Sequence, residues 1–451
     1  MRITTVFCVV AAVLSAGTGV AAPPSPQTGS LRLTLERAVE IALSPEGNIG
    51  LQIAAATIEQ AEALHSQARA VRRPVIESYV SEQNRALNLE AIGIGSGNEQ
   101  LAPLMFPRRV GPFNSFDARA VARYNLVDLG GNRRQEAAVA GVSVARAHDK
   151  RTRDEIAFRV ARLYVVALRH KEQVATAEAN VELAQTLLGF AERNRDAGTG
   201  IAIDVTRAKS QLAEEEYHLA SVRSDQEVAY LRLLHAMGAT LDTQVELTDS
   251  LTREAVAIAS TDQMTEQARA SRSDITAQGR QVEKARLDDR AIHSERLPTV
   301  ALFADFGALN VDANQPVATH AVGFSVKLPL FDGGRRATRR AEVSSKIRRE
   351  ELIERQLLDE VDLQVRESTR RLQLSESRIG VAADGLALAE EELAHARRRY
   401  ENGVTNSLEI SEAQTRLRRA QGNRIEALYA YNVARIDVVE AQGDVRKLLG
   451  Q

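Results

Sequence analysis

Apolar residues recur every three to four positions along two very long proline-free stretches, 132–197 and 335–402. In the first stretch the apolar positions alternate at spacings of four and three between Ile156 and Ala191, and the second follows the same rule as far as Tyr400. An average spacing of 3.5, sustained over this length, predicts helices that pack as coiled coils. A helix of about 66 residues would be about 100 Å long.

A break containing glycine follows each long stretch, and helical spacing then resumes over 205–238 and 408–442. Glycine ends helices because it adopts left-handed backbone angles without a steric penalty. We therefore expect each long helix to turn back on itself as a hairpin. The glycines expected in these tip turns are Gly198, Gly200 and Gly403.

Before each long helix the apolar pattern changes to a period of two, which is typical of strands with two unlike faces. Pro74 and Pro298 would end shorter helices at about 45–72 and 272–296 and mark where the strands start. A loop rich in glycine and proline is expected at about 87–115. The expected strands are about 74–86, 116–128, 298–309 and 320–330.

The two series of elements repeat one plan. The segment 125–134, Asn-Leu-Val-Asp-Leu-Gly-Gly-Asn-Arg-Arg, matches 327–336, Lys-Leu-Pro-Leu-Phe-Asp-Gly-Gly-Arg-Arg, and the glycine pairs are 203 positions apart. Strand-to-helix turns are thus expected at Gly130, Gly131, Gly333 and Gly334. A period this long indicates a duplicated domain rather than a solenoid. The expected organisation is a signal peptide at 1–21, a linker at 22–30, a first repeat at 31–240, an equatorial linker at 241–261, a second repeat at 262–445 and a tail at 446–451.

Helix lengths suggest how the elements stack. Each return helix covers about half of the long helix beside it, and the shorter helix before the strands supplies most of the rest. We expect 205–238 to stack end to end on 272–296, and 408–442 to stack on 45–72. The leftover segments would then lie at mid-height, with strands at one end of a rod and tight turns at the other.

The N-terminal segment predicts export. Arg2 precedes an apolar run at 6–14, and small residues follow as far as Ala22, which is the pattern of a secretory signal peptide cleaved after Ala21. The one cysteine, Cys8, lies inside that run, so no disulfide framework is expected in the mature chain. The net charge of -2 gives no support to a nucleic-acid binder.

No later stretch reaches the ~18 consecutive apolar residues of a spanning helix, so an exported chain of this kind would cross a membrane with strands. A four-stranded sheet leaves two unpaired edges, which a bilayer does not tolerate. Three copies would supply twelve strands and a ring of twelve helices. The expected fold class is mainly α: duplicated coiled-coil hairpins that form a trimeric α-barrel, continuous with a 12-stranded β-barrel.

The strand ends at 125–134 and 328–336, and the segment 399–404 (Arg-Tyr-Glu-Asn-Gly-Val) followed by 409–414, resemble the TolC-type outer-membrane efflux channel family. The resemblance covers about residues 31–445. It implies a homotrimer in the lipid of the outer membrane, whose tunnel crosses the periplasm and docks a periplasmic adaptor and an inner-membrane transporter. The chain would be a passive duct in tripartite efflux or type I secretion, with no cofactor and no nucleic-acid partner.

The resemblance also implies roles at the tip of the tunnel. Asp204, Glu409 and Glu412 match acidic positions that narrow the periplasmic entrance, and Tyr400 matches a tyrosine that hydrogen-bonds across the closed tip. Thr405 stands where an arginine is expected in that family. Two simpler interpretations remain: Asp204 and Glu409 stabilise helix N-termini, and Tyr400 is an ordinary seam residue.

Other functions have weaker support in the sequence. The eight histidines show no zinc-binding spacing, and neither a Gly-Xaa-Ser-Xaa-Gly elbow nor a phosphate loop is present, so we expect no enzyme, no metal and no cofactor. A periplasmic adaptor or a coiled-coil structural protein of an export complex is the alternative, because adaptors also use long hairpins. Two duplicated hairpins favour the channel.

Overall fold

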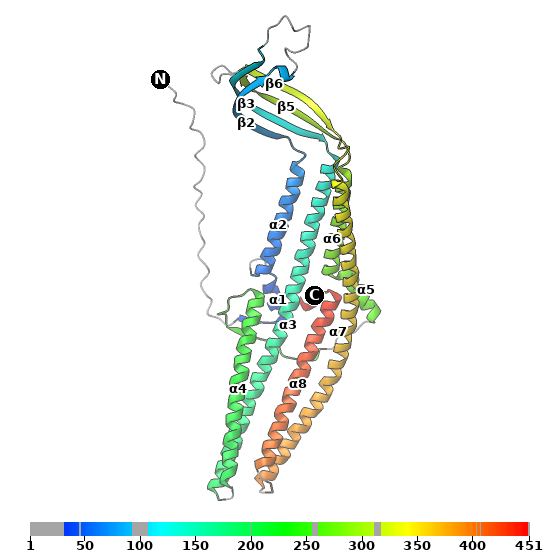
Figure 1. Ribbon diagram of the computed structural model, residues 1–451. Helices are drawn as coiled ribbons and strands as arrows, with labels where there is room; N and C mark the ends of the chain where they lie inside the picture. Colours follow the sequence, from blue (N-terminus) through cyan, green and yellow to red (C-terminus); the bar gives the residue numbers. More distant parts are fainter. Residues whose placement is uncertain are drawn as a thin grey trace, which may run out of the picture.

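A computed structural model describes residues 31–44, 47–92, 107–198, 200–254, 260–310, 317–402, 404–405 and 407–449. The expected signal peptide at 1–21, the linker at 22–30 and Gly403 lie outside these residues. The described chain is an elongated rod, with a curved sheet at one end and long helices running from it to two turns at the other (Figure 1). None of its described helices is both long and apolar enough to cross a bilayer.

The described residues include a four-stranded antiparallel sheet in the order β2-β3-β5-β6. These strands are β2 (Val75–Asn88), β3 (Arg109–Val127), β5 (Thr299–Asn310) and β6 (Val317–Lys327). The two halves of the chain join where β3 pairs with β5, so that β2 and β6 form the edges.

Two strands differ from the expected ranges. β3 begins at Arg109 instead of 116, because residues 109–115 pair with the far end of β2. The glycine and proline that suggested a loop, Gly111 and Pro112, lie at a register irregularity, where proline is tolerated. β6 ends at Lys327 instead of 330, before Pro329, which has no N–H to donate to a ladder.

The helices run as hairpins below the sheet. α3 packs along α4 and α7 packs along α8, while α2 lies against α3, and α6 lies between α3 and α7. The long helices contain no proline, and alanine at many buried positions allows close approach. The bounds are α2 Ile49–Ala70, α3 Leu129–Asp196, α4 Ala202–Met237, α6 Ser273–Ser294, α7 Arg335–Glu401 and α8 Ser407–Gln442.

The end-to-end stacking differs from our expectation: α4 stacks on α2, and α8 stacks on α6 (Figure 1). At the first joint, Asn48 Nδ2 donates to the carbonyl of Ala236 at 3.0 Å. At the second, Ser271 Oγ donates to the carbonyl of Gln442 at 2.5 Å. The expected pairing was wrong because it rested on length alone, and α2 and α6 have equal lengths, as do α4 and α8.

Glycine makes both joints possible. Gly238, after α4, has φ +73°, and a Cβ on it would come within 2.0 Å of the carbonyl oxygen of Gly47. Gly443, after α8, has φ +71°, and a Cβ on it would come within 2.7 Å of the Arg272 side chain. A residue with a side chain would be strained in this backbone region and would also push the stacked helices apart.

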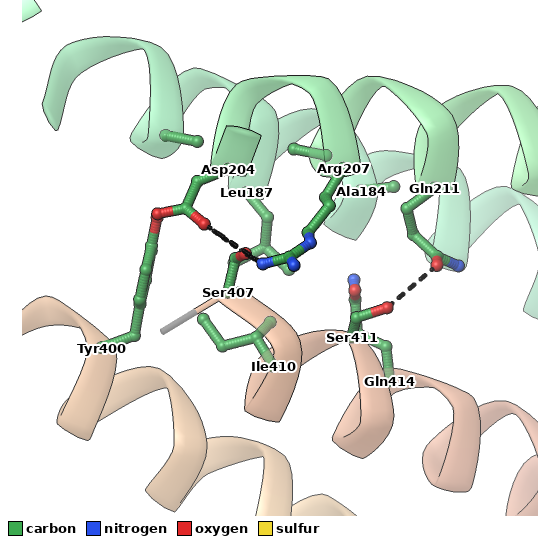
Figure 2. A pocket seen from close by; sticks show the side chains of 12 residues that line it. Ala184, Leu187, Asp204, Arg207, Gln211, Tyr400, Ser407, Ile410, Ser411 and Gln414 are labelled. Atoms are coloured by element: carbon green, nitrogen blue, oxygen red, sulfur yellow. Dashed lines mark hydrogen bonds and ion pairs between the residues drawn. The ribbon is translucent and has the colours of Figure 1, made fainter. Parts of the chain in front are cut away.

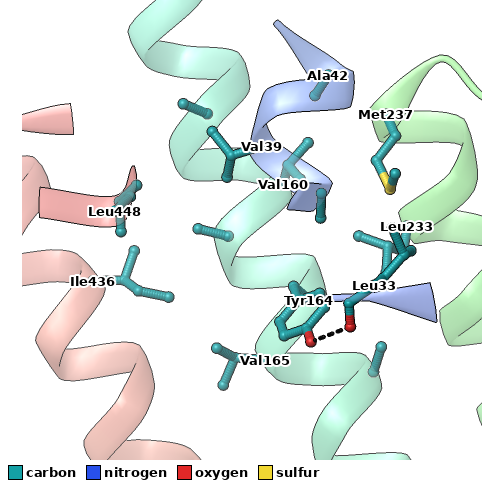
Figure 3. Close-up of a cluster of buried hydrophobic side chains, with 14 of the residues drawn as sticks. Leu33, Val39, Ala42, Val160, Tyr164, Val165, Leu233, Met237, Ile436 and Leu448 are labelled. Carbon is teal, nitrogen blue, oxygen red and sulfur yellow. Dashed lines mark hydrogen bonds between the residues drawn. The ribbon is translucent and has the colours of Figure 1, made fainter. Parts of the chain in front are cut away.

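The largest buried apolar cluster lies at mid-height, where short elements wrap the long helices (Figure 3). Tyr164 of α3 donates its hydroxyl hydrogen bond to the carbonyl of Leu33 and to Asp249, each at 2.9 Å. Val160, Leu233 and Met237 are buried around it. The wrapping elements are β1 (Leu31–Leu33), α1 (Leu35–Ala42), β4 (Val245–Leu247) and the 3-10 helix η2 (Val445–Leu449). The helix α5 (Thr261–Ser271) packs instead against α7 and α8 in a second buried cluster.

Candidate functional site

The tip turns lie side by side at the end of the rod farthest from the sheet (Figure 1). In the first turn, Gly198 has φ +76°, and its N–H donates to the carbonyl of Arg195 at 2.9 Å. The N–H of Gly200 donates to the carbonyl of Asn194, and a Cβ there would come within 2.9 Å of backbone. Both expected glycines therefore occupy a turn that other residues would strain.

Asp204 lies in the first turn of α4 but points to the other hairpin (Figure 2). Its side chain is buried, at 6% exposure for the residue, and accepts a 2.5 Å hydrogen bond from Ser407 Oγ. Arg207 Nη1 lies 3.8 Å from the carboxylate and donates to Ser407 Oγ at 3.3 Å. Asp204 thus links α4 to α8 rather than acting on its own helix end alone.

Tyr400 of α7 contributes both a packed ring and a hydrogen-bonding hydroxyl to the tip. Its ring lies 5.5 Å from that of Phe190 in an edge arrangement and packs against a small apolar cluster that includes Leu187 and Ile410. Its hydroxyl points at the Asp204 carboxylate (Figure 2), with which it shares a hydrogen bond. Burial, together with that carboxylate, raises the pKa of Tyr400.

Further polar contacts continue from Asp204 along the seam between α4 and α8. Ser411 Oγ donates to Gln211 Oε1 at 3.4 Å, and Arg418 Nη1 donates to Glu215 Oε1 at 3.1 Å. Glu215 is only 4% exposed, so Arg418 stabilises a carboxylate that would otherwise be costly to bury. We call the contacting side chains the polar ladder: Asp204, Arg207, Gln211 and Glu215 of α4, with Ser407, Ser411 and Arg418 of α8.

Apart from Asp204, the ladder residues were not predicted from the sequence. A signal was present, because polar residues at 204, 207, 211 and 215 follow the spacing of three and four that apolar seam residues follow elsewhere. A seam with polar positions at this spacing indicates a helix contact that is not fully apolar.

Glu409 and Glu412 lie on a different part of the tip from Asp204. Glu409 accepts a hydrogen bond from Thr405 Oγ1 and forms an ion pair with Arg399 Nη1 at 3.2 Å. Glu412 is more exposed and lies 3.8 Å from Arg416. Thr405, found where an arginine was expected, is therefore a hydrogen-bond donor to Glu409. The cation that pairs with Glu409 is Arg399 of α7. Within the described residues, no three acidic, histidine or cysteine side chains group as metal ligands.

The remaining expected positions lie where the strands meet the helices. Pro74 and Pro298 directly precede β2 and β5. Gly333 and Gly334 have positive φ in the turn before α7, whereas the first glycine pair lies inside the first turn of α3. There, the N–H of Gly131 donates to Asp128 Oδ1 at 2.7 Å, so this pair is part of a helix cap instead of a free turn.

Comparison with known proteins agrees with this architecture. A family described as outer membrane efflux protein matches residues 43–239 and 264–444. The chain is similar to the pyoverdine export outer membrane protein OpmQ of Pseudomonas putida, with 25% identity over 71% of this chain and 66% of that protein. It is also similar to the outer membrane efflux protein BepC of Brucella suis, with 26% identity over 62% of this chain and 61% of that one.

The matched part of the chain spans slightly less than two thirds of the length of these two relatives. A similar fold is present in the solved structure of the outer membrane protein VceC from Vibrio cholerae. The TM-score is 0.72 at 19% identity, covering 91% of this chain and 96% of that one. This likeness concerns the fold.

Proposed function

The chain belongs to the outer membrane efflux protein family, and on that premise we propose that it is the outer-membrane duct of a tripartite efflux or type I secretion system. The duct is passive, and a periplasmic adaptor and an inner-membrane pump supply the energy and the cargo. We propose no catalytic role. The main support for this proposal is the shape of the described chain, which is a curved wall of helices and strands. Both edges of this wall expose apolar side chains.

One open edge is a stripe of apolar residues on α7. Its members are separated by eleven or seven residues, spacings that return to the same side of a helix. Each is 50–74% exposed, unlike ordinary seam residues, which are buried. The stripe consists of Leu352, Leu363, Leu374, Val381 and Leu388.

The opposite edge is formed by the stacked helices α2 and α4. Ile53 and Leu64 of α2 are eleven residues apart, as are Tyr217 and Val228 of α4, and all four are exposed. Long apolar stripes on both edges favour contact with further copies of the chain, because monomeric proteins rarely expose patches of this extent.

The sheet supports the same conclusion. β2 and β6 are its edges, and among the described strands neither has a partner on its outer side. Three chains would pair β6 of one with β2 of the next and close a barrel of twelve strands. We therefore propose a homotrimer in which the repeats at 31–240 and 262–445 each supply two strands and two helical columns.

The tip is the proposed entrance of the duct. The polar ladder and Tyr400 hold the two hairpins of one chain together, so opening at the tip requires these contacts to separate. Glu409 and Glu412 are proposed to face the entrance in three copies, where rings of acidic side chains attract cations.

Fractionation and bilayer recording test the proposal. The purified protein should come from outer membranes, migrate as a trimer on unheated gels and as a monomer after heating, and conduct ions across a planar bilayer. Cells without it should accumulate a cationic dye that complemented cells expel. A periplasmic monomer that does not conduct would refute the duct and would favour the adaptor or structural alternative.

A further inference from the structure

Positive charge is concentrated where the helices meet the sheet. The four connecting segments, 69–74, 128–136, 289–298 and 327–340, contain twelve lysines or arginines and five acidic residues, although the whole chain has a net charge of -2. Each segment adjoins the end of a strand, so all four lie at one level of the rod (Figure 1). We call the lysines and arginines of these segments the basic belt.

The acidic residues at this level neutralise only part of the belt. Glu295 is shared by Arg134, at 3.5 Å, and Arg339, at 2.8 Å. By contrast, Arg72 and Arg335 are exposed and form no ion pair within the described ranges. An excess of seven positive charges per chain is therefore available to an external anion.

Apolar side chains border the belt. In the connection from β6 to α7, Leu330 is 86% exposed and Phe331 is 90% exposed, immediately before the arginines that begin α7. One face of the sheet is also apolar, because the strand register aligns Ile76, Ala122, Ala304 and Val322 across it. Exposed apolar residues next to a band of arginines are typical of segments at a membrane surface.

We propose that the basic belt binds the anionic headgroups of phospholipids in the periplasmic leaflet of the outer membrane. The inference rests on the proposed function, because a sheet placed in that membrane brings the belt to its periplasmic surface. Guanidinium groups form paired hydrogen bonds with phosphate oxygens, and clustered basic residues are attracted to anionic leaflets. Phosphatidylglycerol and cardiolipin have the required charge, whereas phosphatidylethanolamine is neutral overall.

The test measures which lipids the purified full-length protein retains. The protein in detergent is mixed with equal amounts of phosphatidylglycerol and phosphatidylethanolamine with the same acyl chains, and native mass spectrometry counts the bound lipids. The wild type should retain phosphatidylglycerol in preference. The variant Arg335→Gln/Arg339→Gln/Arg340→Gln should lower that preference about tenfold.

A matched control lies on the same helix. The variant Arg366→Gln/Arg370→Gln/Arg371→Gln removes three exposed arginines near the middle of α7, away from the belt, and should leave the preference unchanged. In each triple, two of the three arginines form an ion pair with an acidic side chain. An equal loss of preference in both triples would overturn the proposal.

Three further outcomes would also overturn it. These are equal retention of the two lipids by the wild type, a preference that is the same at 50 and 500 mM NaCl, and displacement of phosphatidylglycerol by millimolar inorganic phosphate. The salt series uses only the wild type, so it tests the lipid-binding proposal even if the triple variant does not assemble. Heated and unheated gels and bilayer conductance of the same sample separate the two proposals, since a conducting trimer without lipid preference refutes the belt alone.

Discussion

Asp204 makes polar contacts with three side chains at the tip, those of Ser407, Arg207 and Tyr400. Its buried carboxylate is well satisfied by these partners, and removing it leaves the half-buried hydroxyls of Ser407 and Tyr400 without this acceptor. Glu409 has a different setting, because its partners Thr405 and Arg399 belong to its own hairpin. Asp204 thus contributes to the contact between the hairpins, whereas the proposed role of Glu409 concerns the charge of the entrance.

We predict that Asp204→Ala opens the tip. Ser407 and Tyr400 lose their common acceptor at a cost of about 1–3 kcal/mol, which disfavours the joined hairpins. Single-channel recordings should show a probability of opening that rises roughly tenfold. Asp196→Ala is the control, since Asp196 is an exposed acid of the same tip whose partner is its neighbour Arg195. Equal recordings for both variants would contradict a special role for Asp204.

We predict that Glu409→Gln/Glu412→Gln weakens the preference for cations. Three copies would lose six negative charges at the proposed entrance, so the reversal potential in a salt gradient should move toward zero. Glu216→Gln/Glu227→Gln removes the same number of charges from exposed positions along α4 and should have a smaller effect. An unchanged reversal potential in the tip variant would refute the entrance role.

At the scale of the elements, two joints decide how the helices form columns. α4 continues into α2, and α8 continues into α6, and each joint depends on a glycine in the left-handed region. The sheet has an equivalent feature at Gly307, where a Cβ would come within 2.3 Å of the Arg119 Cβ on the neighbouring strand. Close approach of backbones, rather than large side chains, sets the geometry at these points.

We predict that Gly238→Ala destabilises the fold. Alanine would be strained at the positive φ of position 238, and its Cβ would clash with the backbone of Gly47. The free energy of unfolding should therefore fall by at least about 2 kcal/mol. Thermal unfolding followed by helical circular dichroism would show it as a lower midpoint. Gly380→Ala is the matched control, because Gly380 lies inside α7 with open space around its Cβ position and should tolerate or favour alanine. Similar midpoints for the two variants would contradict the argument.

At the scale of the whole molecule, the described chain forms a curved wall with two exposed edges. Apolar stripes on α7 and on the α2–α4 column, together with open strands at β2 and β6, leave both edges without partners among the described residues. A wall of this form encloses a passage only when further copies complete it, and in the proposed homotrimer three copies would supply twelve strands.

We predict that Leu363→Glu/Leu374→Glu prevents assembly. Both side chains are about half exposed in the single chain, so glutamate is tolerated there, but burial between chains would leave two unpaired charges. Unheated gels should lose the trimer band, while circular dichroism keeps its helical signal. Gln373→Glu, at an exposed position next to the stripe, should still form trimers. A stable trimer of the double variant would refute contact through this stripe.

Local patterns in the amino-acid sequence were sufficient to predict the helices and strands and their order. Coiled-coil spacing, prolines before strands and glycines after helices act over a few residues, so the ranges of α3, α4, α7 and α8 could be predicted within about three residues. The match between 125–134 and 327–336 likewise showed the duplication without any structure. The resemblance to the TolC-type family indicated Asp204 and Tyr400 as tip residues, and each also lies at a predicted helix end.

Contacts between elements that are distant in the chain became evident only in the folded structure. The stacking of α4 on α2, the pairing of β3 with β5, and the contact of Asp204 with Ser407 all join segments far apart in the chain. Local periodicity does not specify such contacts, because duplicated helices of equal length fit either partner equally well. The choice depends on how the columns pack around α3, where the side chains of both halves of the chain must fit together at once.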